Sequence, residues 1–207
     1  MMVAQHTPGG DDLFAALPDV DDESQRRLHA RLVVEASDAG ILDVAYRIVD
    51  SPLGALLLAT TDKGLVRVAY AREDHDLVLA NLARTISPRL LRAPARLDLV
   101  ARALEEYFVG ARTRFDLSLD LRLSVGFRRT VLSHLTQIAY GTTASYAAVA
   151  AAAGNPKAVR AVGTACATNP LPLVLPCHRV VRSDGTAGQY VGGADAKQAL
   201  LALEAAA

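Results

Sequence analysis

The adjacent residues Cys177 and His178 are the part of the sequence best suited to chemistry. A cysteine thiolate is a strong nucleophile, and a nearby imidazole favours its formation. Pro176 precedes the pair and apolar residues flank it on both sides, so the sulfur would be held in one place and partly shielded from water. An isolated Cys-His pair is more often an inert buried cysteine beside an unrelated histidine, and the rest of the chain must therefore decide.

The composition is typical of a soluble globular protein. The 207 residues are 51% hydrophobic, which is enough for one large domain or two small ones. Two cysteines, Cys166 and Cys177, are too few for a disulfide framework or a cysteine-rich zinc site, and we expect no metal or cofactor. Residues 1–12 contain no signal-peptide pattern and no apolar run reaches membrane-spanning length, so a reducing cytoplasm is the expected compartment.

The formal net charge of zero conceals an asymmetry between the two halves of the chain. Residues 1–120 contain 14 basic and 19 acidic side chains, whereas residues 121–207 contain 8 basic and 3 acidic ones. The basic C-terminal part could attract a polyanion while the acidic part faces away from it.

Periodicity and turn residues predict a small N-terminal α/β domain over residues 23–120, preceded by a flexible acidic tail over residues 1–22. The sheet is expected to be an antiparallel meander, and residues 115–119 form either a short strand or a linker. The expected helices cover 23–36, 74–85 and 96–109, and the expected strands cover 42–49, 55–60 and 65–70.

The C-terminal domain, residues 121–207, is expected to be mostly helical, which makes the fold class α+β. Two of its helices are separated by Gly154-Asn155-Pro156 and form a helix-turn-helix pattern of the winged-helix kind. Extended segments at 173–175 and 179–181 are expected on either side of Cys177. The expected helices cover 125–140, 146–153, 157–168 and 194–206.

Several short segments stand at particular spacings in the C-terminal domain. In chain order they are Thr143-Ala144-Ser145-Tyr146, Gly154-Asn155-Pro156, Arg160-Ala161-Val162-Gly163, Asn169-Pro170, Pro176-Cys177-His178-Arg179-Val180, Gly188-Gln189-Tyr190-Val191-Gly192-Gly193, and Lys197 with Leu200-Leu201 and Glu204. This pattern, over about residues 127–204, resembles the C-terminal domain of the O6-alkylguanine-DNA alkyltransferases, also called methylated-DNA–protein-cysteine methyltransferases. Residues 42–109 also look like the N-terminal domain of that family, although no diagnostic motif occurs there.

The resemblance implies a DNA repair protein that transfers an alkyl group, such as methyl, from O6 of guanine irreversibly to its own Cys177. In that scheme His178 takes the thiol proton through a water molecule, and Glu204 orients His178. Asn169 bridges the active-site turn with hydrogen bonds, and Tyr146 donates a proton to the departing guanine. Each chain would react once.

The resemblance also implies how the lesion is bound. Tyr146, Val180, Tyr190 and Val191 would contact the base, and the glycine-rich loop would present backbone N–H groups near O6. Val191 stands where other members can have a hydroxyl residue, which leaves the range of accepted alkyl groups, and the acceptance of O4-alkylthymine, open.

The partner implied is double-stranded DNA containing O6-alkylguanine, bound by a monomer; clustering on DNA is left open. The base must be rotated out of the duplex before it can react. The helix over 157–168 would enter the minor groove, where small residues permit close approach and Arg160 fills the space left by the base. The small residues expected at the DNA are Ala158, Ala161, Gly163 and Thr164.

Two other interpretations account for part of the pattern. A cysteine hydrolase or acyltransferase would use a Cys-His-Glu triad, but triad partners usually meet through the fold rather than as neighbours in sequence. A regulator that binds DNA without catalysis would use the helix-turn-helix alone. Relatives with a cysteine-rich metal module, or without the reactive cysteine, differ from this chain, which has Cys177 and only one other cysteine.

Overall fold

In the computed structural model, which describes residues 21–206, a four-stranded mixed sheet forms the centre of the N-terminal half. The strand order is β3-β2-β1-β4, and the antiparallel pairing of β1 with β2 and of β2 with β3 confirms the predicted meander. β4 pairs in parallel with β1 and was not predicted, because three residues are too few to show a periodic pattern. The strands are β1 Val44–Val49, β2 Leu56–Thr61, β3 Gly64–Tyr70 and β4 Leu90–Arg92.

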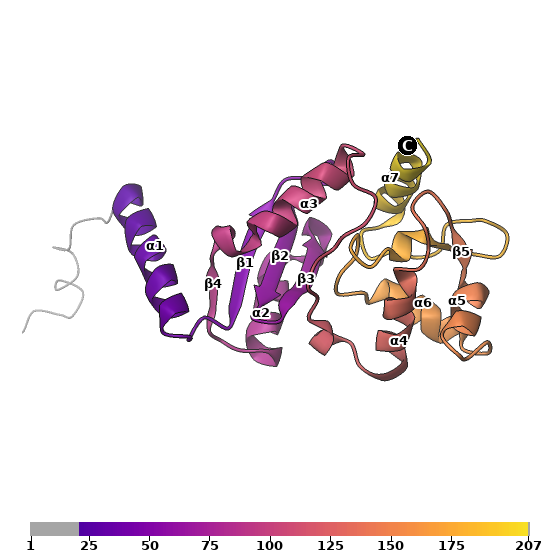
Figure 1. Cartoon of the computed structure of the whole chain (residues 1–207), viewed down its shortest axis with the longest axis horizontal. Helices are drawn as coiled ribbons and strands as arrows, with labels where there is room; N and C mark the ends of the chain where they lie inside the picture. The colour runs from indigo at the N-terminus through magenta and orange to yellow at the C-terminus, as the bar shows by residue number, and fades with distance from the viewer. Residues whose placement is uncertain (1–20, 207) are drawn as a thin grey trace, which may run out of the picture.

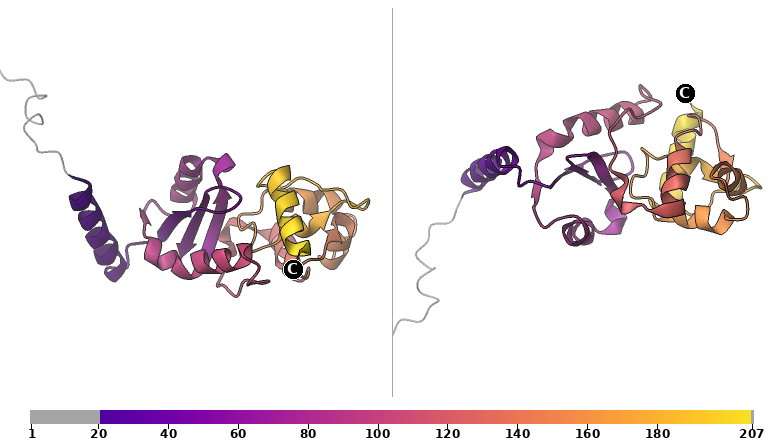
Figure 2. Two further views of the ribbon diagram at one scale, coloured as in Figure 1. Left: turned by 90° about the horizontal axis from the view of Figure 1, so that it is seen from above. Right: turned by 60° about the horizontal axis from the view of Figure 1, so that its bottom comes forward.

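The helices α2 (His75–Thr85) and α3 (Asp98–Phe108) lie on opposite faces of this sheet (Figure 2). Neighbouring residues of a strand point to opposite faces. Leu56 and Leu58 of β2 accordingly belong to the core beneath α3, whereas Leu57 belongs to the core beneath α2. Both faces are buried, which explains why the first four residues of β2 are apolar without alternation.

The first helix, α1 (Asp22–Asp38), lies beside β4 at the outer edge of the sheet (Figure 1), where Nε2 of His29 is 2.6 Å from the carbonyl oxygen of Arg92. Asp21 caps it by accepting a hydrogen bond from the backbone N–H of Ser24 at 2.6 Å. Of the predicted tail, residues 1–20 lie outside the described residues, while Asp21 and Asp22 belong to the cap and the first turn of α1.

The C-terminal half is mostly helical, as predicted, and α5 and α6 follow one another as the expected helix-turn-helix. Two short parallel strands, β5 and β6, pair beside the helices. The elements are α4 Gly126–Leu135, β5 Ala144–Ser145, α5 Tyr146–Ala152, α6 Val159–Ala167, β6 Val180–Val181 and α7 Ala194–Ala205. No helix within residues 21–206 is both long enough and apolar enough to cross a membrane.

Two predicted helix boundaries were wrong. The helix expected over 125–140 ends at Leu135, because the backbone N–H of Ile138 bonds to the carbonyl of Leu135 in a tighter turn. The helix expected from residue 157 begins at Val159, since the N–H of Ala158 bonds to the carbonyl of Asn155 and closes a turn first.

The extended segment expected at 173–175 was also wrong. Residues 171–175 form a turn in which the N–H of Leu175 bonds to the carbonyl of Leu171 at 2.8 Å. Arg179, expected to be extended, belongs to a one-turn 3-10 helix, η5 (Cys177–Arg179), and only Val180–Val181 form a strand.

The two halves share one hydrophobic core, to which β2, β3 and α3 contribute together with α4, α6 and α7. The segment that connects the halves runs along β3. The N–H of Leu65 bonds to the carbonyl of Ser118 at 2.9 Å, and the N–H of Asp120 bonds to the carbonyl of Leu65 at 2.8 Å. Residues 115–119 are therefore a linker that touches the sheet through one bridge at Leu119.

Candidate active site

Cys177 lies at the start of η5 with none of its surface exposed, inside the core shared by the two halves. The turn before it is tight, and the N–H of Cys177 bonds to the carbonyl of Leu175 at 2.7 Å. Within that turn Leu173 has a φ of 72°, a left-handed conformation that is uncommon for a bulky residue. Such strain persists where the surroundings hold it, and here the turn is held by Asn169.

The side chain of Asn169 is buried and joins three parts of the turn. Its Oδ1 accepts a hydrogen bond from the N–H of Leu171 at 3.0 Å, and its Nδ2 donates to the carbonyl of Leu175 at 2.8 Å. The same Nδ2 lies 3.1 Å from the sulfur of Cys177 and donates to it. Asn169 therefore both closes the turn and supplies a hydrogen-bond donor to the sulfur.

Burial dominates the ionisation of Cys177 and raises the pKa of its thiol to about 11, against the lowering effects of the Asn169 bond and the charge of Lys197. At pH 7 only about one thiol in ten thousand is then ionised. The sulfur can become a nucleophile at neutral pH only if a base removes its proton as it reacts.

His178 is placed to be such a base. Its Nε2 lies 2.9 Å from Oε1 of the ionised Glu204, so Nε2 carries the ring proton and donates a hydrogen bond to the carboxylate. Burial lowers the pKa of His178 below 6.5 despite the opposing effect of Glu204, and the ring is neutral at pH 7. Its Nδ1 is buried and has no hydrogen-bond partner within residues 21–206, which leaves a lone pair able to accept a proton.

The carboxylate of Glu204 is held by more donors than the sequence suggested. Oε1 accepts from the hydroxyl of Tyr107 at 2.7 Å, and Arg179 donates to both oxygens at 2.9 Å. The N–H of Gly141 also donates to Oε2, at 3.2 Å. Burial alone would raise the pKa of Glu204, but the hydrogen bonds from His178, Arg179 and Tyr107 bring it down to about 2. The carboxylate is ionised at any physiological pH.

Lys197 is a second buried cation near the sulfur. Its side chain is fully buried, its ammonium group donates to the carbonyl of Val180 at 2.5 Å, and it lies 6.0 Å from the centre of the Tyr146 ring. Burial lowers the pKa of Lys197, and its charge favours ionisation of Cys177. Neither Lys197 nor Arg179 was assigned a role from the sequence, although both lie in the motif pattern. Both charged side chains are buried, and the sequence alone does not reveal this burial.

The two tyrosines expected at the substrate differ in their surroundings. Tyr146, the first residue of α5, is partly exposed and packs against the glycine-rich loop, where a Cβ at Gly188 would lie 2.1 Å from its hydroxyl oxygen. Tyr190 is buried; its hydroxyl lies 2.9 Å from that of Tyr70, and its ring centre lies 6.1 Å from that of His178. A side chain at residue 188 would therefore require the ring of Tyr146 to move.

A cavity of about 460 Å³ lies at the edge of the site, between the two halves. Asn169, Pro170 and Val191 line one side of it, and Arg67 and Glu73 of the N-terminal half line another. Cys177, Tyr146 and Val180 are not among its lining residues, and Val180 is buried in β6. Among residues 21–206, no three His, Cys, Asp or Glu side chains come together as metal ligands would.

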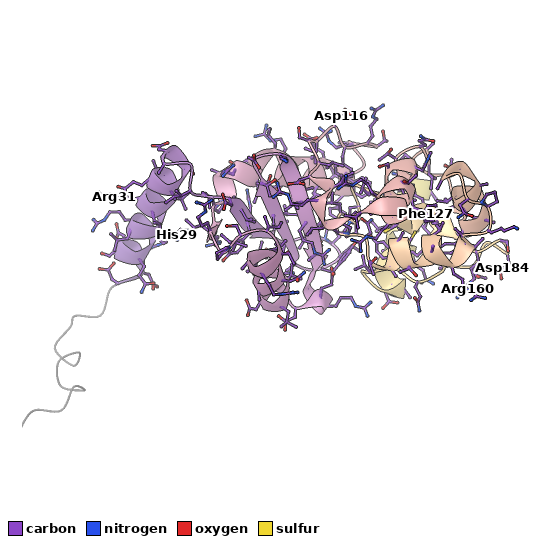
Figure 3. The ribbon with its side chains drawn as sticks, turned by 90° about the horizontal axis from the view of Figure 1, so that it is seen from below. His29, Arg31, Asp116, Phe127, Arg160 and Asp184 are labelled. Atoms are coloured by element: carbon purple, nitrogen blue, oxygen red, sulfur yellow. The ribbon has the colours of Figure 1, made fainter. Side chains whose placement is uncertain are left out.

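The helix α6 presents small side chains on its exposed face. Ala161 and Thr164 are exposed and Ala158 and Gly163 partly so, whereas Val162 is buried in the core. Arg160 is exposed on the surface of the C-terminal half, where Figure 3 labels it. The expected DNA-contacting residues thus lie on α6 or at its N-terminal cap. They are separate from the buried group formed by Cys177, His178, Asn169 and Glu204.

Comparison with known proteins identifies both halves of the chain. Residues 44–121 match the family described as "6-O-methylguanine DNA methyltransferase, ribonuclease-like domain", and residues 126–206 match its "DNA binding domain". Two similar relatives are named methylated-DNA–protein-cysteine methyltransferase. The one from Mycolicibacterium paratuberculosis is 41% identical over 78% of this chain and 92% of its own, and the one from Methanosarcina barkeri is 38% identical over 77% and 96%.

Solved structures agree with these matches. The crystal structure of the O6-methylguanine methyltransferase of Mycobacterium tuberculosis is 36% identical, with a TM-score of 0.69 over 79% of this chain and 93% of the other. A structure of the same protein in complex with DNA has the same TM-score and identity and covers 78% of this chain. The α+β fold of two such halves, and the sequence matches that span both of them, show that this chain belongs to the 6-O-methylguanine DNA methyltransferase family.

Proposed function

We propose that this protein repairs DNA by transferring an alkyl group from O6 of guanine to the sulfur of its own Cys177. The observation that carries the proposal is the buried group in which Asn169 donates a hydrogen bond to the sulfur and Glu204 accepts one from a neutral His178, which orients the ring. The names of the relatives, and the DNA bound to the protein from M. tuberculosis, support DNA as the substrate.

The reaction begins with removal of the thiol proton. His178 accepts this proton at Nδ1 through a water molecule, and the ionised Glu204 stabilises the imidazolium that forms. The sulfur then attacks the alkyl carbon, a carbon–sulfur bond forms, and the carbon–oxygen bond breaks with its electron pair passing to guanine. Tyr146 donates a proton to the departing base. The thioether has no group that water can displace, so the protein reacts once.

Binding of the damaged nucleotide uses the exposed face of α6. The helix enters the minor groove, where Ala158, Ala161, Gly163 and Thr164 permit close approach, and Arg160 fills the stack after the base rotates out. The hydroxyl of Thr164 bonds to the carbonyl of Arg160 at 3.2 Å, so it is already engaged within the helix.

The glycine-rich loop closes the pocket around the rotated base. Tyr146 and Val180 contact the base, Val191 limits the space near the alkyl group, and backbone N–H groups of the loop approach O6. Tyr190 also contacts the base, and its ring packs edge-on against that of His178. The protein works as a monomer on double-stranded DNA in the cytoplasm, with no cofactor.

Single-turnover stoichiometry tests this function. The protein is mixed with an excess of duplex that carries radiolabelled O6-methylguanine, and the label transferred to protein is counted after the reaction stops. We expect one methyl group per chain at completion. More than one equivalent, or release of the label as methanol, would indicate a hydrolase, and no transfer together with a sequence-specific footprint would indicate a regulator.

A further inference from the structure

The outer strand of the N-terminal sheet makes direct contact with the active-site turn. Within residues 21–206, β3 is at the edge of the sheet, and apart from the bridge between Leu65 and Leu119 its outer side faces no strand. The N–H of Val68 in β3 donates to the carbonyl of Pro170 at 2.9 Å, and Pro170 follows Asn169 directly. The residue that donates to the reactive sulfur is therefore followed directly by one whose backbone is bonded to the other half of the molecule.

Arg67 strengthens this attachment. Its Nη1 lies 3.0 Å from the carbonyl of Val68, 3.2 Å from that of Pro170 and 3.5 Å from that of Asn169. The side chain is 14% exposed. A guanidinium presents its donors in a rigid plane, which suits it to holding several carbonyl groups in one arrangement.

The guanidinium is itself fixed from the opposite side. Its Nη2 forms an ion pair with Oε2 of Glu73, a side chain that is 17% exposed. Oε1 of Glu73 accepts from the N–H of Tyr70 at 2.9 Å. Glu73, Arg67 and Asn169 thus form a continuous chain of polar contacts from the sheet to the sulfur.

We propose that Arg67 is a positioning residue that keeps the amide of Asn169 against the sulfur of Cys177. Hydrogen bonds weaken steeply as distance and angle depart from their optimum, so a small displacement of the Asn169 backbone removes the donor from the sulfur. Arg67 thereby gives the N-terminal half a role in the chemistry, although sequence motifs indicated none there. This role rests on the proposed function only in that Cys177 is the reacting group.

The test compares Arg67→Ala with a matched control, Arg47→Ala, in a Cys166→Ala background that leaves one thiol. Arg47 lies on the same sheet and forms an ion pair with Asp98 at 2.6 Å, away from the active-site turn. The readout is the rate at which iodoacetamide alkylates Cys177 at a fixed pH. Loss of the donor should slow alkylation about tenfold, which corresponds to a rise of about one unit in the thiol pKa. The control should react like the parent.

The sign of the change separates positioning from mere attachment. If Arg67 only joins the two halves, Arg67→Ala loosens the fold, exposes the buried thiol and makes alkylation faster, and the proposal is overturned. An unchanged rate overturns it as well. The double variant of Arg67→Ala with Asn169→Leu should react no more slowly than Asn169→Leu alone, because both changes remove the same bond.

Two further variants keep the test decisive if Arg67→Ala folds poorly. Arg67→Lys retains the charge without the planar fork and should restore part of the alkylation rate, and Glu73→Gln should slow alkylation through the weakened anchor of Arg67. Rates equal to the parent in both would contradict the proposal. Because iodoacetamide reacts with Cys177 directly, these outcomes do not depend on alkyl transfer from DNA. If the proposed function itself fails, the parent protein will take up no label from the labelled duplex.

Discussion

Replacement of His178 by Gln should change the pH dependence of the reaction as well as its rate. In the parent protein, His178 is neutral above its lowered pKa and can accept the thiol proton at any pH from about 7 upward, so the transfer rate should be flat there. Gln can still donate to Glu204, but it cannot accept the proton as a base. The variant must rely on the small fraction of thiolate that forms without help.

The loss of rate in His178→Gln, and its change with pH, can be estimated from general-base catalysis and from the pKa of the Cys177 thiol. General-base catalysis contributes about 100- to 10,000-fold, and this range is the expected deficit of His178→Gln at pH 7. With a thiol pKa of about 11, the ionised fraction rises about tenfold for each pH unit below that value. Between pH 7 and about pH 9.5 the variant should therefore gain about 300-fold while the parent stays level.

The assay uses an O6-methylguanine nucleoside, because a duplex is itself sensitive to high pH. Single-turnover rates of both proteins are measured at half-unit steps of pH, and unfolding curves at each pH verify that both remain folded. The gap between the two rates should close steadily as pH rises. A gap of constant size, or a parent rate that also rises about tenfold per unit, would refute the role of His178 as the base.

Three other changes test separate parts of the site. Glu204→Gln removes a carboxylate whose pKa falls from 4.5 to about 2 on folding, a difference of about 3 kcal/mol. That stability is fully present above pH 4.5 and is lost as pH falls toward 2, so urea unfolding should show a difference between the proteins that shrinks on acidification; a constant difference would contradict the burial of an ionised carboxylate. Arg160→Ala should slow repair in duplex DNA far more than transfer from the free base, while Lys157→Ala should weaken binding to all DNA. If the ratio of the duplex rate to the free-base rate is the same in the parent and in Arg160→Ala, Arg160 does not fill the space left by the base. Cys166→Ala should keep full transfer activity, since burial raises the pKa of the Cys166 thiol further than that of Cys177, and loss of transfer would show that Cys166 takes part.

Short-range patterns in the sequence predicted most of the fold. The three strands of the meander and the cores of its helices follow from alternation and helical spacing, and both depend on neighbours within a few residues. The turn at 171–175 was not predicted, because its apolar residues resemble those of a strand. The side chain of Asn169 closes this turn. Side-chain hydrogen bonds over two and six residues, which apolar periodicity does not reveal, overrode the preference for a strand there.

The candidate site could be predicted only in part, because several of its contacts join residues that lie far apart in the sequence. Cys177 and His178 are neighbours in sequence, and Asn169 and Glu204 were expected from the resemblance to a known pattern. Tyr107 reaches Glu204 across 97 residues and Arg67 reaches Asn169 across 102, and no motif marks either one. Such contacts arise from the packing of the two halves against each other, which periodicity along one chain cannot reveal.

The most direct test of the central claim locates the transferred group on the protein. Parent and Cys177→Ala proteins are incubated with a duplex containing O6-methylguanine, digested, and mapped by mass spectrometry. We predict that one methyl group is found on the peptide containing Cys177 in the parent, that Cys177→Ala acquires none, and that it still binds the duplex. A methyl group on any other residue, or demethylated DNA with an unmodified Cys177, would contradict the account.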